Sequence, residues 1–186
     1  MLAGLGAASG LLSWLLVDFA DELKLRFEYE LYGIQLTPVA IYPGLVFGLL
    51  FGAFLRLRAG FSWLRAIGYV LATLVGYGAA FHTAFYIIAN GFADHESLLA
   101  FAIGGVPAGF AGSLILGLLT RPLAGPTAAS FFQISVIVGT SAGALLGLAG
   151  LDTHNAWGFL LFFVLWQGSY AACLAPLLSR RLTVGL

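Results

Sequence analysis

Long apolar segments alternate along this chain with short connections that hold most of its charged residues. A bilayer core about 30 Å thick requires about 20 apolar residues in each helix that crosses it. Six segments fit that pattern, and they run approximately from Leu2 to Val17, Pro38 to Leu55, Leu64 to Ala89, Leu98 to Leu119, Ala128 to Leu148 and Ala156 to Leu178. We therefore expect an all-α integral membrane protein with six transmembrane helices in a single transmembrane domain over residues 1–186.

Composition strengthens this interpretation and narrows the partners. Apolar residues make up 61% of the chain and charged residues 9%, whereas soluble domains have about 25% charged residues. The net charge is zero, so the chain lacks the basic excess that drives nucleic-acid binding. Cys173 is the single cysteine, which excludes an intrachain disulfide and a cysteine-rich metal site. The expected partner is the lipid bilayer, and we expect no nucleic acid.

The distribution of charge predicts an orientation. Six of the eight basic residues fall in the even-numbered connections or after the last segment, namely Arg56, Arg58, Arg65, Arg121, Arg180 and Arg181. The other connections hold all eight acidic residues, with Lys24 and Arg26. Because arginine-rich ends stay in the cytoplasm, we expect a multi-pass protein of the cell (inner) membrane with cytoplasmic N- and C-termini.

Two apolar segments carry glycines at four-residue spacing, which is typical of a glycine zipper. These are Gly44, Gly48 and Gly52 in the second segment and Gly139, Gly143 and Gly147 in the fifth. Such spacing forms a smooth face that lets another helix approach closely within lipid. We expect these faces to pack helices, and the neighbour is either a helix of this chain, a partner membrane protein or a second copy.

The matching glycines raise the question of an internal duplication. Gly76-Tyr77-Gly78-Ala79-Ala80 also resembles Gly168-Ser169-Tyr170-Ala171-Ala172. Halves of three helices each, residues 1–93 and 94–186, would be inverted relative to one another, as in many transporters. The alternative is that glycine-rich helices match by composition alone, and the sequence leaves both interpretations open.

The polar segment after the first helix has its own pattern. Leu23 to Leu31 alternates apolar and charged residues, which predicts an extracytoplasmic amphipathic strand or hairpin returning through Tyr32 and Gly33 to Ile34–Leu36. A helix remains an alternative, because Phe19, Leu23, Phe27 and Leu31 are spaced by four. Either form suits a cap over the helix ends, an edge for a partner chain or a surface anchor.

Polar residues at membrane depth are the candidates for a binding site. No Asp, Glu, Lys or Arg lies near the middle of a segment, which argues against a proton or sodium pump. His82, Tyr86 and Asn90 share one helical face, and the alternative role for His82 is a hydrogen bond that fixes helix packing. Gln167 and Tyr170 lie at similar depth in the last segment. We expect these five residues to surround one outward-opening ligand cavity.

Catalytic and metal-binding motifs are missing from the sequence. It has no Gly-x-Ser-x-Gly elbow, phosphate-binding loop or His-Glu-x-x-His sequence. Asp94-His95-Glu96 and Asp152-Thr153-His154-Asn155 contain metal-ligand residue types, but no helical spacing holds them together. We therefore expect no enzyme activity, metal site or cofactor.

Two functions fit these observations. The first is a small transport protein, or a substrate-binding membrane subunit, that takes a compact solute in its cavity. In size, in six segments and in cytoplasmic termini the chain resembles the substrate-binding subunits of energy-coupling-factor vitamin transporters, a resemblance of architecture without a shared motif. The alternative is a non-catalytic structural or assembly subunit of a larger membrane complex.

Overall fold

Over the residues described, the fold is a bundle of six α-helices with one short hairpin. The computed structural model describes residues 1–31, 34–92, 97–124, 128–151 and 157–184, with side chains in the last range as far as residue 172. Its elements are α1 (Leu2–Asp18), β1 (Tyr29–Leu31), β2 (Ile34–Leu36), α2 (Pro38–Arg58), α3 (Trp63–Gly91), α4 (Leu98–Ala124), α5 (Ala128–Gly143), the 3-10 helix η2 (Ala144–Leu151) and α6 (Trp157–Val184). The predicted all-α fold is therefore confirmed.

Within these ranges, three helices are long and apolar enough to cross a membrane, which indicates a membrane protein. They are α2, α3 and the part of α4 from Leu98 to Arg121. The other apolar helices, Leu2–Asp18, Phe132–Leu148 and Trp157–Ala172, are shorter over the residues described. Large apolar side chains such as Leu71, Ile137 and Leu161 are exposed on the surface of the bundle, as they would be against lipid.

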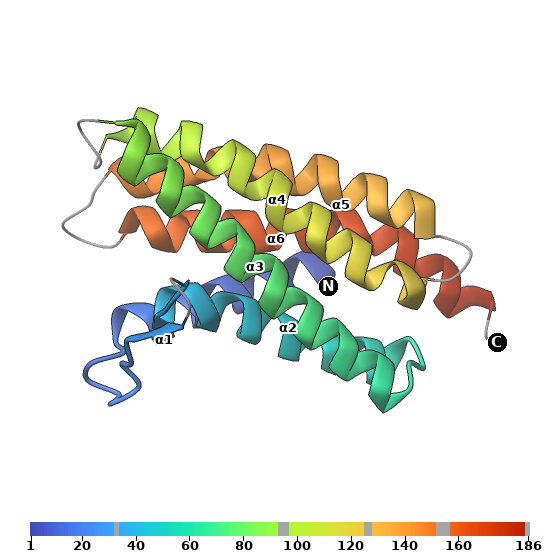
Figure 1. The fold of residues 1–186 in the computed structure, drawn as a ribbon. Helices are drawn as coiled ribbons and strands as arrows, with labels where there is room; N and C mark the ends of the chain where they lie inside the picture. Colours follow the sequence, from blue (N-terminus) through green and yellow to red (C-terminus); the bar gives the residue numbers. More distant parts are fainter. Residues whose placement is uncertain (32–33, 93–96, 125–127, 152–156, 185–186) are drawn as a thin grey trace.

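The helices form a closed ring. Each packs against the next one along the chain, and α6 packs back against α1. In Figure 1, α1 and α2 form the lower part of the bundle, α4, α5 and α6 form the upper part, and α3 crosses obliquely from one to the other. This arrangement leaves the space between the two parts to be filled by side chains from α2, α3 and α6.

Local sequence explains where α2 and α3 meet. Pro38 occupies the first turn of α2, where its missing N–H costs nothing. Gly60 adopts a positive φ of 67° after the last turn, and the Phe61 amide donates to the Leu55 carbonyl at 3.1 Å. The Ser62 side chain then accepts from the Arg65 amide and starts α3.

Both predicted glycine faces are filled by helices of this chain. A Cβ atom at Gly44 would lie 2.8 Å from the Tyr77 Cβ, so the glycines of α2 let α3 approach to backbone contact. A Cβ atom at Gly147 would lie 3.0 Å from the Ala102 Cβ, and Gly139 and Gly143 likewise pack on α4. A partner protein or second copy would therefore have to use another surface.

The duplication is not settled by these contacts. If the halves were equivalent, α2 on α3 would correspond to α5 on α6, yet the α5 glycines Gly139 and Gly143 face α4. The second match agrees better, since Gly76 packs on α4 and Gly168 packs on α1, which are equivalent positions. The inverted repeat therefore stays a prediction.

The predicted hairpin is present but shorter than expected. β1 and β2 are antiparallel, with Tyr29 opposite Leu36 and Leu31 opposite Ile34. The expected strand from Leu23 is wrong, because Lys24 has a positive φ of 55° and the Leu25 amide donates to the Ala20 carbonyl at 2.8 Å. These bonds close a helix-terminating turn, so alternation over residues 23–28 does not produce a strand, nor does the alternative helix extend through it.

Candidate functional site

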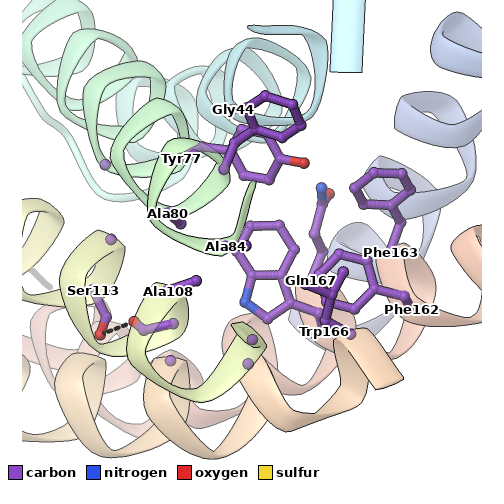
Figure 2. Close-up of a pocket in the computed structure, with 18 of the residues that line it drawn as sticks. Gly44, Tyr77, Ala80, Ala84, Ala108, Ser113, Phe162, Phe163, Trp166 and Gln167 are labelled. Carbon is purple, nitrogen blue, oxygen red and sulfur yellow. Dashed lines mark hydrogen bonds between the residues drawn. The ribbon is translucent and has the colours of Figure 1, made fainter. Parts of the chain in front are cut away.

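A cavity of about 470 Å³ lies inside the helix ring, lined by residues of α2, α3, α4, α5, η2 and α6. Small residues on α3 and α4, including Ala80, Ala84 and Ala108, form one wall. Aromatic side chains of α6, including Phe162, Phe163 and Trp166, form the facing wall (Figure 2). The volume falls within the range of about 300–1,000 Å³ that is usual for sites of small organic molecules.

The aromatic wall is held by ring contacts. Trp166 stacks on Phe162 with centroids 5.6 Å apart, and it lies 5.4 Å from Tyr77 of α3. Phe47 of α2 contacts Tyr170 edge-on at 5.8 Å and closes the cavity toward α2. Such contacts fix large side chains in place and so preserve the space between them.

Most polar groups of the lining are already satisfied by their own helices. The Thr73 hydroxyl donates to the Val70 carbonyl at 2.8 Å. The Ser113 hydroxyl donates to the Gly109 carbonyl, which Figure 2 shows as a dashed line. No acidic or basic side chain and no histidine is found among the described lining residues. The lining is therefore neutral and mostly apolar.

Gln167 is the main exception. Its side chain is 1% exposed, and its Nε2 donates to the Ser13 hydroxyl of α1 at 3.1 Å. Ser13 in turn donates to the Ser9 carbonyl at 2.8 Å. The Gln167 Oε1 is buried without a hydrogen-bond partner in the described part of the chain. This leaves one acceptor unsatisfied where water is excluded, an arrangement that a bound molecule would relieve.

Glycines on α1 explain how this buried contact forms. Gly6 and Gly10 lie against the backbone of α6 at Gln167 and Phe163, where a Cβ atom would collide. Ser9 and Ser13, one helical turn apart, are fully buried in the same interface. The four-residue spacing of both pairs is visible in the sequence and is the signal for this contact.

Tyr170 lies one turn beyond Gln167 on α6 and is also buried. Its hydroxyl points toward Ser135 of α5, although neither oxygen makes a hydrogen bond of good geometry within the described residues. The Tyr69 hydroxyl of α3 is buried and unpartnered in the same sense. The two predicted residues of α6 therefore both line the cavity.

The three predicted residues of α3 do not line it. His82 is half-buried and meets the Phe81 ring at 5.4 Å, whereas Tyr86 is 70% exposed. Asn90 is exposed and donates to the Tyr86 carbonyl at 2.8 Å. The structure thus does not bring the five predicted residues together. The physical reason is that α3 turns the adjacent stripe containing Tyr77, Phe81 and Phe85 toward the cavity.

Tyr77 is the lining residue that the sequence interpretation missed. It lies on α3 at four-residue spacing with Phe81 and Phe85, and this aromatic stripe is the signal that would have identified it. No hydrogen bond to its hydroxyl is present among the described residues, and the hydroxyl faces the interior of the site in Figure 2.

The cavity reaches the surface along the C-terminal half of α3. Phe85 lines it and is still 52% exposed, and Ala89 is also both lining and exposed. The rim is therefore apolar. A solute that enters here comes from an apolar environment rather than from water.

The polar segment between α1 and α2 lies apart from the cavity. Arg26 pairs with Asp21 and Glu28 at 2.8 Å each, and its hydrogen bond to Glu28, then that to Asp21, raises the pKa of the exposed guanidinium. The Tyr42 hydroxyl donates to the Leu25 carbonyl and fixes the segment to α2. None of its described residues lines the cavity, so the contacts support an attachment to α2 rather than a cap.

The remaining sequence features give no further site. Asp94-His95-Glu96 and Asp152-Thr153-His154-Asn155 lie outside the described residues. Comparison with protein-family models, curated proteins and solved structures finds no match. The candidate site therefore rests on the geometry of the cavity alone.

Proposed function

We propose that this protein is a small membrane transport protein, or the substrate-binding subunit of one, that binds a compact solute in the central cavity. The observation that carries the proposal is the cavity of about 470 Å³ with the buried, unpartnered Oε1 of Gln167 among its described lining residues. An empty apolar space of this size is costly for a helix bundle, because the residues around it lose packing contacts. A bound solute restores those contacts.

The same proposal includes a membrane topology. We propose six crossings of the cell (inner) membrane with both termini in the cytoplasm. Its support is that each of the six predicted segments forms an apolar helix, and that Arg56, Arg58 and Arg65 flank the α2–α3 connection. Figure 1 shows this connection at the same end of the bundle as the C-terminal ends of α4 and α6. Basic residues at one end fit the cytoplasmic side of a membrane.

The neutral lining limits the solute. A charged molecule would lose its hydration on entering and would find no opposite charge among the described lining residues. This supports a neutral, mostly apolar solute and disfavours ion transport.

The test is the recovery of a small molecule with the purified protein. Mass spectrometry should detect one bound compound in protein extracted from its own membrane. Ala108→Phe, which fills the cavity from α4, should remove that compound. Ala111→Phe is the matched control, because Ala111 lies on the same helix outside the lining. Equal recovery from both variants would contradict a binding role for the cavity.

The structural or assembly role remains the alternative outcome of this experiment. It would be supported if other membrane proteins co-purify in fixed proportion and no small molecule is found. The structure removes one reason for it, because the glycine faces of α2 and α5 are occupied within the chain.

A further inference from the structure

The two ends of the cavity differ in chemistry. Its mouth beside Phe85 and Ala89 is apolar, whereas two polar groups without a hydrogen-bond partner in the described part of the chain lie deeper, the Tyr77 hydroxyl and the Gln167 Oε1. Figure 2 shows the Gln167 amide and the Tyr77 hydroxyl on the same side of the cavity. We refer to Tyr77 and Gln167 together as the polar end.

Both residues of the polar end are fixed in place. Gln167 is held by its hydrogen bond to Ser13, so its Nε2 is occupied and its Oε1 is the group left to bind. Tyr77 is positioned by Gly44, where no side chain intervenes between α2 and α3, and by the Trp166 ring. The indole nitrogen of Trp166 points away from the Gln167 amide in Figure 2 and so is not part of the polar end.

The polar end offers one donor and one acceptor. A phenolic O–H donates, and an amide oxygen accepts. A ligand hydroxyl satisfies both, because it accepts from Tyr77 and donates to Gln167. A carbonyl or ether oxygen accepts from Tyr77 but leaves the Gln167 Oε1 unsatisfied. A charged head is disfavoured because no charged side chain occurs among the described lining residues.

We infer that the solute is a neutral, lipid-soluble alcohol or phenol, which enters from the bilayer at Phe85 and places its hydroxyl between Tyr77 and Gln167. This inference rests on the proposed function and specifies the chemical class that the cavity takes. The apolar body of the solute lies against the aromatic wall of α6, and its hydroxyl supplies the partner that the Gln167 Oε1 lacks.

The inference is tested with three matched probes: para-nonylphenol, its methyl ether and nonylbenzene. Their dissociation constants are measured for the full chain in lipid nanodiscs, with empty nanodiscs as a correction for partitioning. The phenol offers a donor and an acceptor, the ether offers an acceptor, and nonylbenzene offers neither. We expect affinity to fall by about fivefold at each step, as the loss of one ordinary hydrogen bond gives.

Two variants assign these steps to residues. Gln167→Leu should lower the affinity for the phenol to that for the ether and leave nonylbenzene unchanged. Tyr77→Phe should lower the affinity for the ether to that for nonylbenzene. It removes only a hydroxyl that has no hydrogen bond among the described residues, so it should fold normally even if Gln167→Leu does not. Tyr86→Phe is the matched control, since Tyr86 lies on the same helix outside the cavity.

The outcomes separate the inference from the proposed function. Equal affinity for all three probes in the unchanged protein, or equal preferences in the unchanged protein and Tyr77→Phe, would overturn the hydroxyl inference while leaving a functional cavity. Absence of saturable binding for every probe would overturn the proposed function and the inference with it.

Discussion

The polar faces of α3 and α6 look alike in sequence and have opposite positions in the structure. On α3, His82, Tyr86 and Asn90 follow one another at four-residue spacing, yet none of them lines the cavity. On α6, Gln167 and Tyr170 are buried and line it. The difference is made by the neighbours: α6 is covered by the glycine and serine face of α1, whereas on the His82 face no described residue lies within 4 Å of a Cβ placed at Gly78.

This comparison shows what identifies an inward polar face in a membrane bundle. A polar stripe near the end of a long helix can lie at the membrane surface, where Tyr and Asn are well solvated. An amide in the middle of an apolar helix has no such alternative and must find a partner inside the bundle. Gln167 finds Ser13, while Asn90 donates to the carbonyl of Tyr86 on its own helix.

The largest expected difference between the two faces is in their tolerance of a large residue. Gly10→Leu should destabilise the protein by about 3 kcal/mol or more, because a Cβ atom there lies 2.6 Å from the Val164 Cα of α6. Gly78→Leu, on the His82 face, should be tolerated, since nothing described lies within 4 Å of its Cβ position. The free energy of unfolding in mixed micelles measures both. Similar losses for the two variants would contradict the helix assignment of these faces.

A smaller difference is expected when the polar side chains themselves are shortened. Gln167→Ala should cost about 2–4 kcal/mol, because it leaves a void in the α1–α6 interface and removes the partner of Ser13. His82→Ala should cost less than about 1 kcal/mol, since this side chain is half-buried. The same unfolding measurement applies, and a larger loss for His82→Ala would reverse the comparison.

The smallest difference concerns a single hydroxyl. Ser13→Ala removes the acceptor of the Gln167 Nε2 and should cost about 1–2 kcal/mol. Ser169→Ala, on the exposed side of α6, should change stability by less than about 0.5 kcal/mol, because its hydroxyl only donates to the Trp166 carbonyl. If the two serine variants are equally stable, the Gln167–Ser13 bond does not hold α1 on α6.

The sequence predicted the helices better than their neighbours. Apolar segment lengths placed six helices, and glycine spacing at Gly44–Gly52 and Gly139–Gly147 correctly predicted close packing. Spacing alone does not say which helix fills a glycine face, because that depends on contacts between distant parts of the chain. The duplication suggested by those glycines stays a prediction for the same reason.

The cavity was predicted in part. Gln167 and Tyr170 were identified because an amide and a phenol at depth need partners, but Tyr77 was passed over for its neighbour on the polar stripe. Adjacent stripes of a helix differ by about 100° of rotation, and the hydrophobic pattern of a lipid-embedded helix does not fix that rotation. The positive φ of Lys24 was likewise invisible in the alternating pattern of the segment after α1.

The central claim is that a lipid-soluble molecule reaches the cavity beside Trp166. The direct measurement is quenching of tryptophan fluorescence by a brominated alkylbenzene, titrated into the protein in lipid nanodiscs. Trp166 lines the cavity, while Trp63 and Trp157 are exposed and report the surrounding lipid. The account predicts a saturable component of quenching that Trp166→Phe removes and Ala108→Phe prevents. Quenching that rises without saturation, and equally in both variants and the unchanged protein, would contradict it.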